Sequence, residues 1–325
     1  MKLRVVDLFA GCGGLSMGLT RAGFDVVAAF DSWSSAIRCY NENFDHKAEM
    51  MDLSQSEQCA SVINDIDPDI IAGGPPCQDF SHAGKRKEGL RASLTSNFAT
   101  IVQIVRPAWF IMENVDRAKT SNSYAAARRI FKLAGYGLTE RTLNACFCGV
   151  PQKRKRFFCI GGLGSRDDIL GPILDERLSK TALTVRKYLR SEIDVEYYYR
   201  HPRNYSRRGV YSIDEPAPTM RGMNRPVPKG YPGHAADATD VTSELRQLTT
   251  YERGRIQTFP KTYRWIGTKT DTEQMIGNAV PVELASFVGR ALRDYIETGG
   301  NGCSEAKITT TATKEKELLW HQQRA

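Results

Sequence analysis

The fold is decided near the start of the sequence, by Leu3-Arg4-Val5-Val6-Asp7-Leu8-Phe9-Ala10-Gly11-Cys12-Gly13-Gly14. Its apolar half predicts a buried strand, and its glycines predict a tight loop that leads into a helix over residues 15–22. A strand, a glycine-rich loop and a helix N-terminus together form a common site for nucleotide-type cofactors. A dinucleotide fingerprint would have a third glycine at position 16, which is Ser16 here. The loop by itself is compatible with NAD, FAD or S-adenosylmethionine.

Strands and helices continue to alternate through the first half of the chain. Apolar runs predict further strands at 25–30, 70–72, 108–112 and 157–160, and amphipathic patterns predict helices at 34–43, 96–105 and 124–133. This alternation predicts an α/β fold with a mostly parallel twisted sheet that is flanked by helices. After about Gly164 the pattern breaks into short segments rich in Tyr, Arg, Pro and Gly, which indicates a second, smaller lobe. An amphipathic helix returns over 280–296.

Composition excludes several classes of protein. The chain has 325 residues and 41% hydrophobic content, enough for one large core and a smaller lobe. It has no apolar run of membrane-span length and no signal-peptide pattern at its start, so we expect neither a membrane span nor secretion. The eight cysteines are scattered, and the close pair Cys146 and Cys148 lacks the further ligands of a zinc site. We therefore expect reduced thiols, no metal and a cytoplasmic protein.

Positive charge is concentrated in one segment. Between Arg177 and Lys229 there are twelve Lys and Arg against five Asp and Glu, so most of the chain's net charge of +8 lies there. The interleaved tyrosines of this segment are Tyr188, Tyr197, Tyr198, Tyr199, Tyr205 and Tyr211. Basic side chains among aromatic ones suit a surface that binds the phosphate backbone of a nucleic acid. A merely solvated charged face would show both signs mixed, so we expect nucleic acid as the partner.

The most informative tetrapeptide is Gly74-Pro75-Pro76-Cys77, which follows the apolar run 70–72. Two consecutive prolines stiffen the backbone and remove two amide donors, so Cys77 is predicted to lie on a rigid corner. A thiolate is the strongest ordinary nucleophile that a protein offers near neutral pH. Most cysteines are structural. Cys77 is favoured as a nucleophile because other motifs with chemical groups occur in the same sequence. They are Glu113-Asn114-Val115, which supplies an acid, and Gln152-Lys153-Arg154-Lys155-Arg156, which supplies cations.

These segments resemble the motifs of the cytosine-C5 DNA methyltransferases of the prokaryotic restriction-modification type, and they occur in the family's order. The resembling segments are Asp7 to Gly14, Gly73 to Ser81, Glu113 to Val115, Gln152 to Arg156 and Gly277 to Pro281. One such motif would carry a risk of coincidence, but five in order identify the chain as a member of the family. The resemblance implies the methyltransferase fold that uses S-adenosylmethionine, without a metal, and double-stranded DNA as the substrate.

The resemblance also implies a reaction and its residues. Carbon 5 of cytosine is a poor nucleophile until a thiolate adds to C6, and the resemblance assigns this attack to Cys77. Glu113 would contact N3 of the base and stabilise the added proton. Arg156 would hold O2 of the base, and Arg154 would neutralise a phosphate or support the nucleophile loop. Because the attack cannot occur inside a stacked duplex, the cytosine must be flipped out.

Two further sets of residues follow from the resemblance. The expected S-adenosylmethionine site consists of Phe9, Gly11, Gly13, Leu15, Asp31, Asp52, Pro76 and Asn278. The expected DNA-binding residues are Ser81, Arg207, Arg208 and Thr219. In the first set, Asp31 would bind the ribose and Asp52 would lie near the adenine amine. Each residue has an ordinary structural explanation, such as a helix cap for Asn278, and only their joint occurrence favours the site.

The last motif implies that the C-terminal helix packs back beside the first motif. The predicted domains are therefore a catalytic unit over 1–163 and 272–298, a target-recognition unit over 164–271 that binds DNA, and a polar tail over 299–325. We expect a monomer in the cytoplasm of a prokaryote, associated with the nucleoid, or a phage protein. A cognate restriction endonuclease is a candidate partner.

Two alternatives stay open. One is a tRNA cytosine-5 methyltransferase of the same fold, although such enzymes usually carry a Cys-Phe-Thr signature that this sequence lacks. The other is a catalytically inert relative that binds DNA, which the intact Cys77, Glu113 and Arg156 argue against.

Overall fold

The computed structural model of the protein describes residues 2–76, 93–242 and 244–299. Seven strands in this part of the chain are β1 Arg4–Leu8, β2 Asp25–Asp31, β3 Ala48–Met50, β4 Ile70–Gly73, β5 Trp109–Val115, β6 Tyr136–Asn144 and β8 Lys155–Leu163. They form one sheet in the order β3-β2-β1-β4-β5-β8-β6. The strands from β3 to β5 are parallel, and β8 and β6 add an antiparallel edge. The predicted α/β class with a mostly parallel sheet is confirmed.

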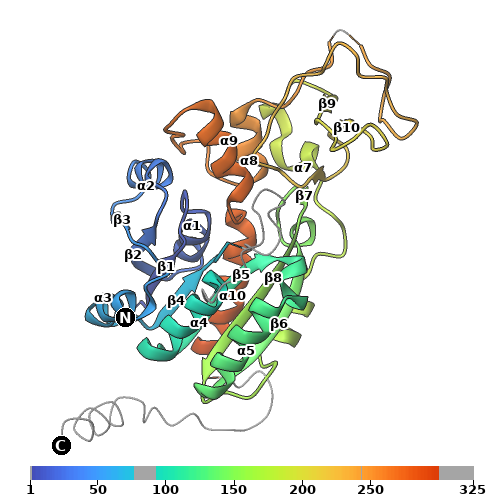
Figure 1. Cartoon of the computed structure of the whole chain (residues 1–325). Helices are drawn as coiled ribbons and strands as arrows, with labels where there is room; N and C mark the ends of the chain where they lie inside the picture. Colours follow the sequence, from blue (N-terminus) through green and yellow to red (C-terminus); the bar gives the residue numbers. More distant parts are fainter. Residues whose placement is uncertain (1, 77–92, 243, 300–325) are drawn as a thin grey trace, which may run out of the picture.

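Helices cover both faces of this sheet (Figure 1). One face carries α3 (Ser56–Ile66), α4 (Leu94–Val105) and α5 (Asn122–Leu133), and the other carries α1 (Gly14–Arg21), α6 (Gly171–Glu176) and α10 (Val282–Glu297). Alternation along β5 explains this arrangement. Phe110 and Met112 pack on the α4 side, whereas Ile111 packs on the α10 side. Successive apolar residues are therefore buried on both faces, as the parallel part of such a sheet requires.

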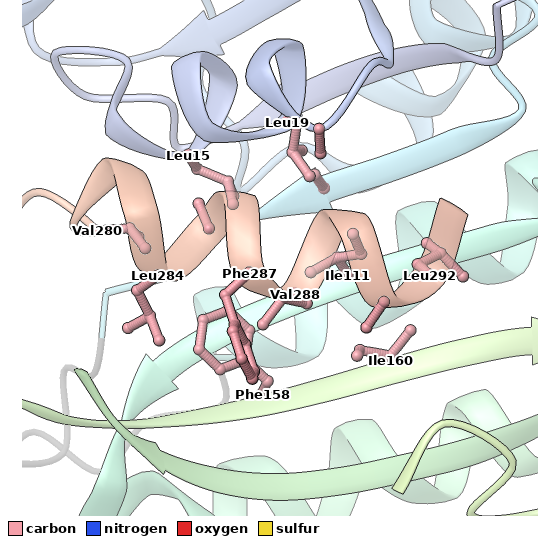
Figure 2. Packing of buried hydrophobic residues seen from close by; sticks show 14 of the residues in the cluster. Leu15, Leu19, Ile111, Phe158, Ile160, Val280, Leu284, Phe287, Val288 and Leu292 are labelled. Atoms are coloured by element: carbon pink, nitrogen blue, oxygen red, sulfur yellow. The ribbon is translucent and has the colours of Figure 1, made fainter. Parts of the chain in front are cut away.

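The C-terminal helix α10 lies beside α1, although the two helices are far apart in the sequence (Figure 2). Leu284 and Val288 of α10 belong to the same buried cluster as Leu15 of α1. The helices approach closely because Gly18 has no side chain: a Cβ there would lie 2.4 Å from the Cβ of Ala285. The helix after the last motif thus packs beside the first motif, whereas the predicted domain bounds stay a prediction.

A second group of elements lies at one end of the molecule (Figure 1). It consists of α7 (Val185–Leu189), the antiparallel strands β9 (Tyr197–Tyr199) and β10 (Val210–Ser212), α8 (Thr250–Ile256) and α9 (Lys269–Asn278). An apolar cluster that includes Leu189 and Tyr198 holds this group together. Helix α9 belongs to both parts, because Ile276 joins this cluster and Met275 joins another that contains Cys12. We call the part of this group that precedes α9, residues 185–268, the second lobe.

Within the described ranges, no helix is long and apolar enough to span a membrane. The same residues contain no group of three or more His, Cys, Asp or Glu side chains that could hold a metal ion. The cysteines among them are free and buried. Burial raises the pKa of Cys148 and of Cys159 to about 12, so these thiols are poor nucleophiles.

Candidate active site

A cavity of about 660 Å³ opens at the carboxyl ends of the parallel strands. Its wall contains Phe9 directly after β1, Asp31 at the end of β2, Pro75 shortly after β4 and Glu113 near the end of β5. In open α/β sheets this edge is where ligands bind. The volume lies in the range of pockets that enclose a small-molecule ligand. The fold therefore places a binding site where the sequence motifs lie.

Many of the residues predicted from the sequence line this cavity. They are Phe9, Gly11, Leu15, Asp31, Asp52, Pro76, Glu113, Arg156 and Asn278. Gly13 and Arg154 are described but do not belong to the wall. Cys77, which follows Pro76 in the sequence, and Ser81 lie outside the described residues. The cavity thus brings cofactor-type residues and the pair Glu113 and Arg156 into one space.

Some residues of the wall were not predicted, among them Trp33, Leu53 and Arg117. Trp33 and Leu53 come two and three residues after the ends of β2 and β3. Arg117 lies in the short helix Asp116–Thr120, directly after β5. No sequence motif marks these three residues. They could have been found only from their position, just beyond the carboxyl end of a parallel strand.

The loop after β1 has an unusual backbone conformation. Phe9 has a φ of 59°, in the left-handed region that bulky side chains rarely adopt. Gly11 has a φ of 55°, and its amide donates a hydrogen bond of 2.7 Å to Oδ2 of Asp31. The other oxygen of Asp31 accepts from the amide of Trp33 at 2.8 Å. Asp31 therefore ties the loop to the end of β2, and strain of this kind is usually retained at functional sites.

Gly13 shapes the loop without lining the cavity. Its φ is 84°, and a Cβ there would lie 2.4 Å from Cε2 of Phe44. Phe44 stacks on Tyr40 of α2 (Ser34–Asn41), with 4.0 Å between the ring centroids. Only glycine allows the loop to pack this closely on the two rings.

A buried chain of hydrogen bonds spans the same loop. Oγ of Ser16 donates to Oδ2 of Asp7 at 2.5 Å, and the hydroxyl of Tyr40 donates to Oγ of Ser16 at 2.9 Å. The Tyr40 oxygen also lies 2.6 Å from Nε2 of His46. Burial raises the pKa of Asp7 to about 7, although the hydrogen bond from Ser16 lowers it. In the sequence, the signal for these hydrogen bonds is Asp7, a carboxylate inside the apolar run Leu3 to Phe9.

Replacing Asp7 by asparagine should remove a pH dependence of stability. Because the pKa of Asp7 is raised to about 7, the folded chain holds a proton that the unfolded chain has lost above about pH 4. The free energy of unfolding therefore falls as the pH rises from about 4 to 7, by up to about 1.4 kcal/mol per pH unit from this group. An asparagine side chain does not titrate, so the stability of the Asp7→Asn variant relative to wild type should increase over this range. Urea unfolding at several pH values measures it, and a constant difference would contradict the assignment.

The predicted catalytic pair lies on the neighbouring strands β5 and β8. Nε of Arg156 lies 2.8 Å from Oε1 of Glu113; the side chain of Glu113 is buried, and that of Arg156 is 11% exposed. Burial raises the pKa of Glu113, although the charges of Arg156 and Arg154 lower it. The next residue, Asn114, donates from Nδ2 to the carbonyl oxygen of Pro75 at 3.0 Å. A carboxyl that can bind a proton is thus held beside the proline turn that precedes Cys77.

Comparison with known proteins agrees with this geometry. A family model described as C-5 cytosine-specific DNA methylase matches residues 3–294. The chain belongs to this methylase family. The methylase is 52% identical over 295 residues to "Type II methyltransferase M.HindV" of Haemophilus influenzae, an alignment that covers 90% of this chain and 97% of that protein. It is 51% identical over 295 residues to "Type II methyltransferase M.HgiDI" of Herpetosiphon aurantiacus, with 90% and 95% covered. The predicted family and enzyme class are confirmed.

Solved structures share the fold of this methylase. S. pombe Dnmt2 has a TM-score of 0.68 and 20% identity, over 91% of this chain and 99% of that one. A putative DNA modification methyltransferase encoded within an E. coli prophage has a TM-score of 0.66 and 23% identity, over 91% and 100%. At these identities the similarity concerns the fold alone.

Arg154 of the methylase is fully buried. Its guanidinium donates to the carbonyl oxygens of Met220 at 3.1 Å, Gly277 at 2.9 Å and Ala279 at 3.0 Å. The suggested contact with a phosphate is therefore not possible in this structure, because the side chain does not reach solvent. Arg154 instead joins the second lobe, at Met220, to the last turn of α9 and the residue that follows it.

Two buried glutamines, Gln152 and Gln257, reinforce this junction. Nε2 of Gln152 donates to Oε1 of Gln257 at 2.7 Å, and Oε1 of Gln152 accepts from the amide of Met220 at 2.8 Å. Nε2 of Gln257 donates to the carbonyl oxygens of Ile276 and Ala279. The junction between the two lobes is therefore a polar network with satisfied amides.

Replacing Arg154 by methionine should destabilise the methylase strongly. Three carbonyl oxygens would lose a donor at a buried position, and among the described residues Ala279 alone of these keeps a second donor, Gln257. Each group left unsatisfied costs roughly 1–3 kcal/mol. We expect a loss of at least about 3 kcal/mol in the free energy of unfolding, measured by urea denaturation. Arg207→Met, at an exposed position, is the matched control and should change stability by no more than about 0.5 kcal/mol. Equal effects of the two substitutions would contradict the structural role of Arg154.

The predicted DNA-binding residues of the second lobe differ in their surroundings. Arg207 is exposed, whereas Arg208 forms an ion pair with Glu215 and lies 4.2 Å from the centre of the Tyr211 ring. Oγ1 of Thr219 donates to a backbone carbonyl of β7 (Gln152–Lys153) at 2.8 Å, beside the short strand β11 (Ala217–Pro218). Arg207 and Arg208 are therefore not equivalent, since a carboxylate already neutralises Arg208. Their contact with DNA stays a prediction.

Proposed function

We propose that the methylase transfers the methyl group of S-adenosylmethionine to C5 of a cytosine that is flipped out of a specific short duplex sequence, through a covalent bond between Cys77 and C6. The observation that carries this proposal is the cavity whose wall contains both the cofactor loop and the pair Glu113 and Arg156. A methyl donor and a base that share one enclosed space can be held in a reactive arrangement.

The cofactor end of the cavity fits S-adenosylmethionine. Asp31 and Asp52 offer carboxylates near the ends of β2 and β3, which suit the hydroxyl and amine groups of an adenosine. Phe9 and Trp33 offer aromatic surface for the purine. When bound, this group supplies an electrophilic methyl on a sulfonium. Residues Pro76 and Asn278 would limit the opposite end of its site.

The base end of the cavity supplies acid catalysis. The thiolate of Cys77 would form a bond to C6 while the proton of Glu113 passes to N3, so that charge does not accumulate in the ring. Arg156 would orient Glu113 and hold O2 of the base. After methylation the C5 proton leaves to solvent, the bond between sulfur and C6 breaks, and the thiolate of Cys77 is restored.

Bisulfite sequencing of plasmid DNA from cells that express the methylase tests this proposal. In a host without its own cytosine methylase, we expect protected cytosines at one short sequence, and none when the expressed chain carries Cys77→Ser. Sequencing of tRNA from the same cells addresses the alternative substrate. Unprotected plasmid together with a newly modified tRNA cytosine would replace the proposal by the tRNA alternative.

We also propose that the methylase acts as a monomer at the nucleoid and protects DNA from a restriction endonuclease with the same site. Support comes from the relatives, which are named Type II methyltransferases, and from the basic net charge. Sedimentation of the purified chain with and without duplex DNA tests the monomer.

A further inference from the structure

The basic residues of the second lobe fall into two classes. Some arginines are already neutralised: Arg186 forms ion pairs with Glu196 and Asp214, and Arg208 with Glu215. Others form no ion pair within the part of the chain that the structure describes. They include Arg190 and Arg207, and also four arginines of the segments 200–203 and 221–225: Arg200, Arg203, Arg221 and Arg225. We call these four the open arginines.

The open arginines come from two segments that are joined by hydrogen bonds. Nη2 of Arg200 donates to the carbonyl oxygen of Thr219 at 2.8 Å, and Nη2 of Arg221 donates to the carbonyl oxygen of His201. After burial, the positive charges of Arg200 and Arg203 help lower the pKa of Arg221 to about 10. Arg200, Arg203 and Arg221 are therefore gathered together, and Arg225 lies with them, because its charge and that of Arg221 both act on His201.

A buried ion pair fixes the second of these segments. Nε of Arg253 lies 2.6 Å from Oε2 of Glu273, and both side chains are buried. The guanidinium of Arg253 also donates to the carbonyl oxygens of Arg221 and Met223. Oε1 of Glu273 accepts from Nδ2 of Asn224 at 3.3 Å. The backbone over 221–224 is thus held rigidly before any ligand arrives, which lowers the entropic cost of binding.

The same segment touches the wall of the cavity. A Cβ on Gly277 would lie 2.1 Å from the backbone nitrogen of Gly222, so the two backbones are in direct contact. Gly277 lines the cavity, and Arg221 directly precedes Gly222. The open arginines therefore begin at the rim of the space in which the base would react.

We propose that Arg200, Arg203, Arg221 and Arg225 form the surface that binds the phosphates of the DNA strand beside the flipped nucleotide. Crowded like charges are unfavourable without an anion, and a planar guanidinium donates in pairs to phosphate oxygens. No carboxylate of the described chain supplies that anion, and the rigid backbone over 221–224 places Arg221 next to the cavity. This inference rests on the proposed function and assigns the phosphate contact to these residues rather than to Arg208.

The salt dependence of DNA binding tests the assignment. Arg203 and Arg225 are exposed, and the substitutions Arg203→Gln and Arg225→Gln remove one cation each without removing a backbone contact named above. On a mixed-sequence duplex, log K falls as log salt rises. Each substitution should make this slope less steep by about 0.9, and the double variant by about twice that. Arg186→Gln, in the same lobe but paired with two carboxylates, is the matched control and should keep the wild-type slope.

His201 provides a second measurement inside the cluster. Burial lowers its pKa, and the charges of Arg225 and Arg221 lower it further, while the hydroxyl of Tyr199 lies 3.1 Å from its Nδ1. A phosphate among these arginines would offset their charge. The pKa of His201, followed by NMR, should therefore rise when duplex DNA binds.

The outcomes separate this inference from the proposed function. If wild type methylates plasmid but Arg203→Gln and Arg225→Gln keep its salt slope, the open arginines do not bind phosphate and only this inference fails. A pKa of His201 that stays constant on DNA binding leads to the same conclusion. If wild type neither methylates nor binds duplex DNA, the proposed function fails first.

Discussion

Replacing Cys77 by serine is expected to abolish methyl transfer while S-adenosylmethionine still binds. Serine keeps the size of the side chain but offers a hydroxyl that is far less nucleophilic than a thiolate toward C6. We expect the rate to fall by at least about 10⁴-fold, because removing a covalent nucleophile costs factors of this order or larger. Transfer of labelled methyl to duplex DNA measures the rate, and calorimetry measures cofactor binding.

A duplex with 5-fluorocytosine at the target position gives a direct control. Fluorine cannot leave as a cation, so wild type should remain covalently attached to the DNA after methylation. The Cys77→Ser variant should give no adduct that survives denaturing electrophoresis. An adduct at wild-type yield in the variant would assign the nucleophile to another residue.

The substitution Glu113→Gln should slow the chemical step much more than it weakens DNA binding. The carboxyl is buried beside Arg156, and burial raises its pKa, which favours the protonated form that can give a proton to the base. Glutamine has a similar shape but no acidic proton. We expect the single-turnover rate with pre-bound DNA to fall by roughly 10²–10⁴-fold.

Two further measurements decide the interpretation of Glu113. The affinity for DNA should change little, whereas the melting temperature should fall, because the substitution leaves the guanidinium of Arg156 without its carboxylate partner. A rate equal to wild type together with weaker binding would make Glu113 a structural residue. Asn114→Ala, which removes the hydrogen bond to Pro75, should instead affect rate and cofactor binding together.

The parallel part of the fold could be predicted because its strands are unbroken apolar runs. The run 70–72 corresponds to β4, and 108–112 lies largely within β5. Strand β6 was missed, since its centre, Thr139-Glu140-Arg141-Thr142, is polar and the strand pairs only with β8 at the sheet edge. Helix α3 was missed for a related reason: it buries only Cys59, Ala60 and Ile63, too narrow a stripe for a clear pattern.

The site was predictable where residue type and spacing define the chemistry. Glu113 and Arg156 lie in the same cavity as the residues of the glycine loop. Burial was not predictable, because Arg154 and Arg156 are two residues apart on a basic run and yet only Arg156 reaches the cavity. The sequence offers Arg207 and Arg208 equally as residues that bind DNA. The structure distinguishes them, because only Arg208 forms an ion pair with Glu215.

The position of α10 affects how the chain is made. Its partner α1 ends about 260 residues earlier in the sequence, which at 5–20 residues per second is roughly 13–50 s of synthesis. During that time Leu15 and Leu19 lack the surface that covers them in the finished molecule. A ribosome-bound or prematurely terminated chain therefore cannot complete its cofactor domain. We expect early fragments to depend on chaperones and to remain inactive. Methylase activity should therefore arise in the cell only after nearly the whole message has been translated.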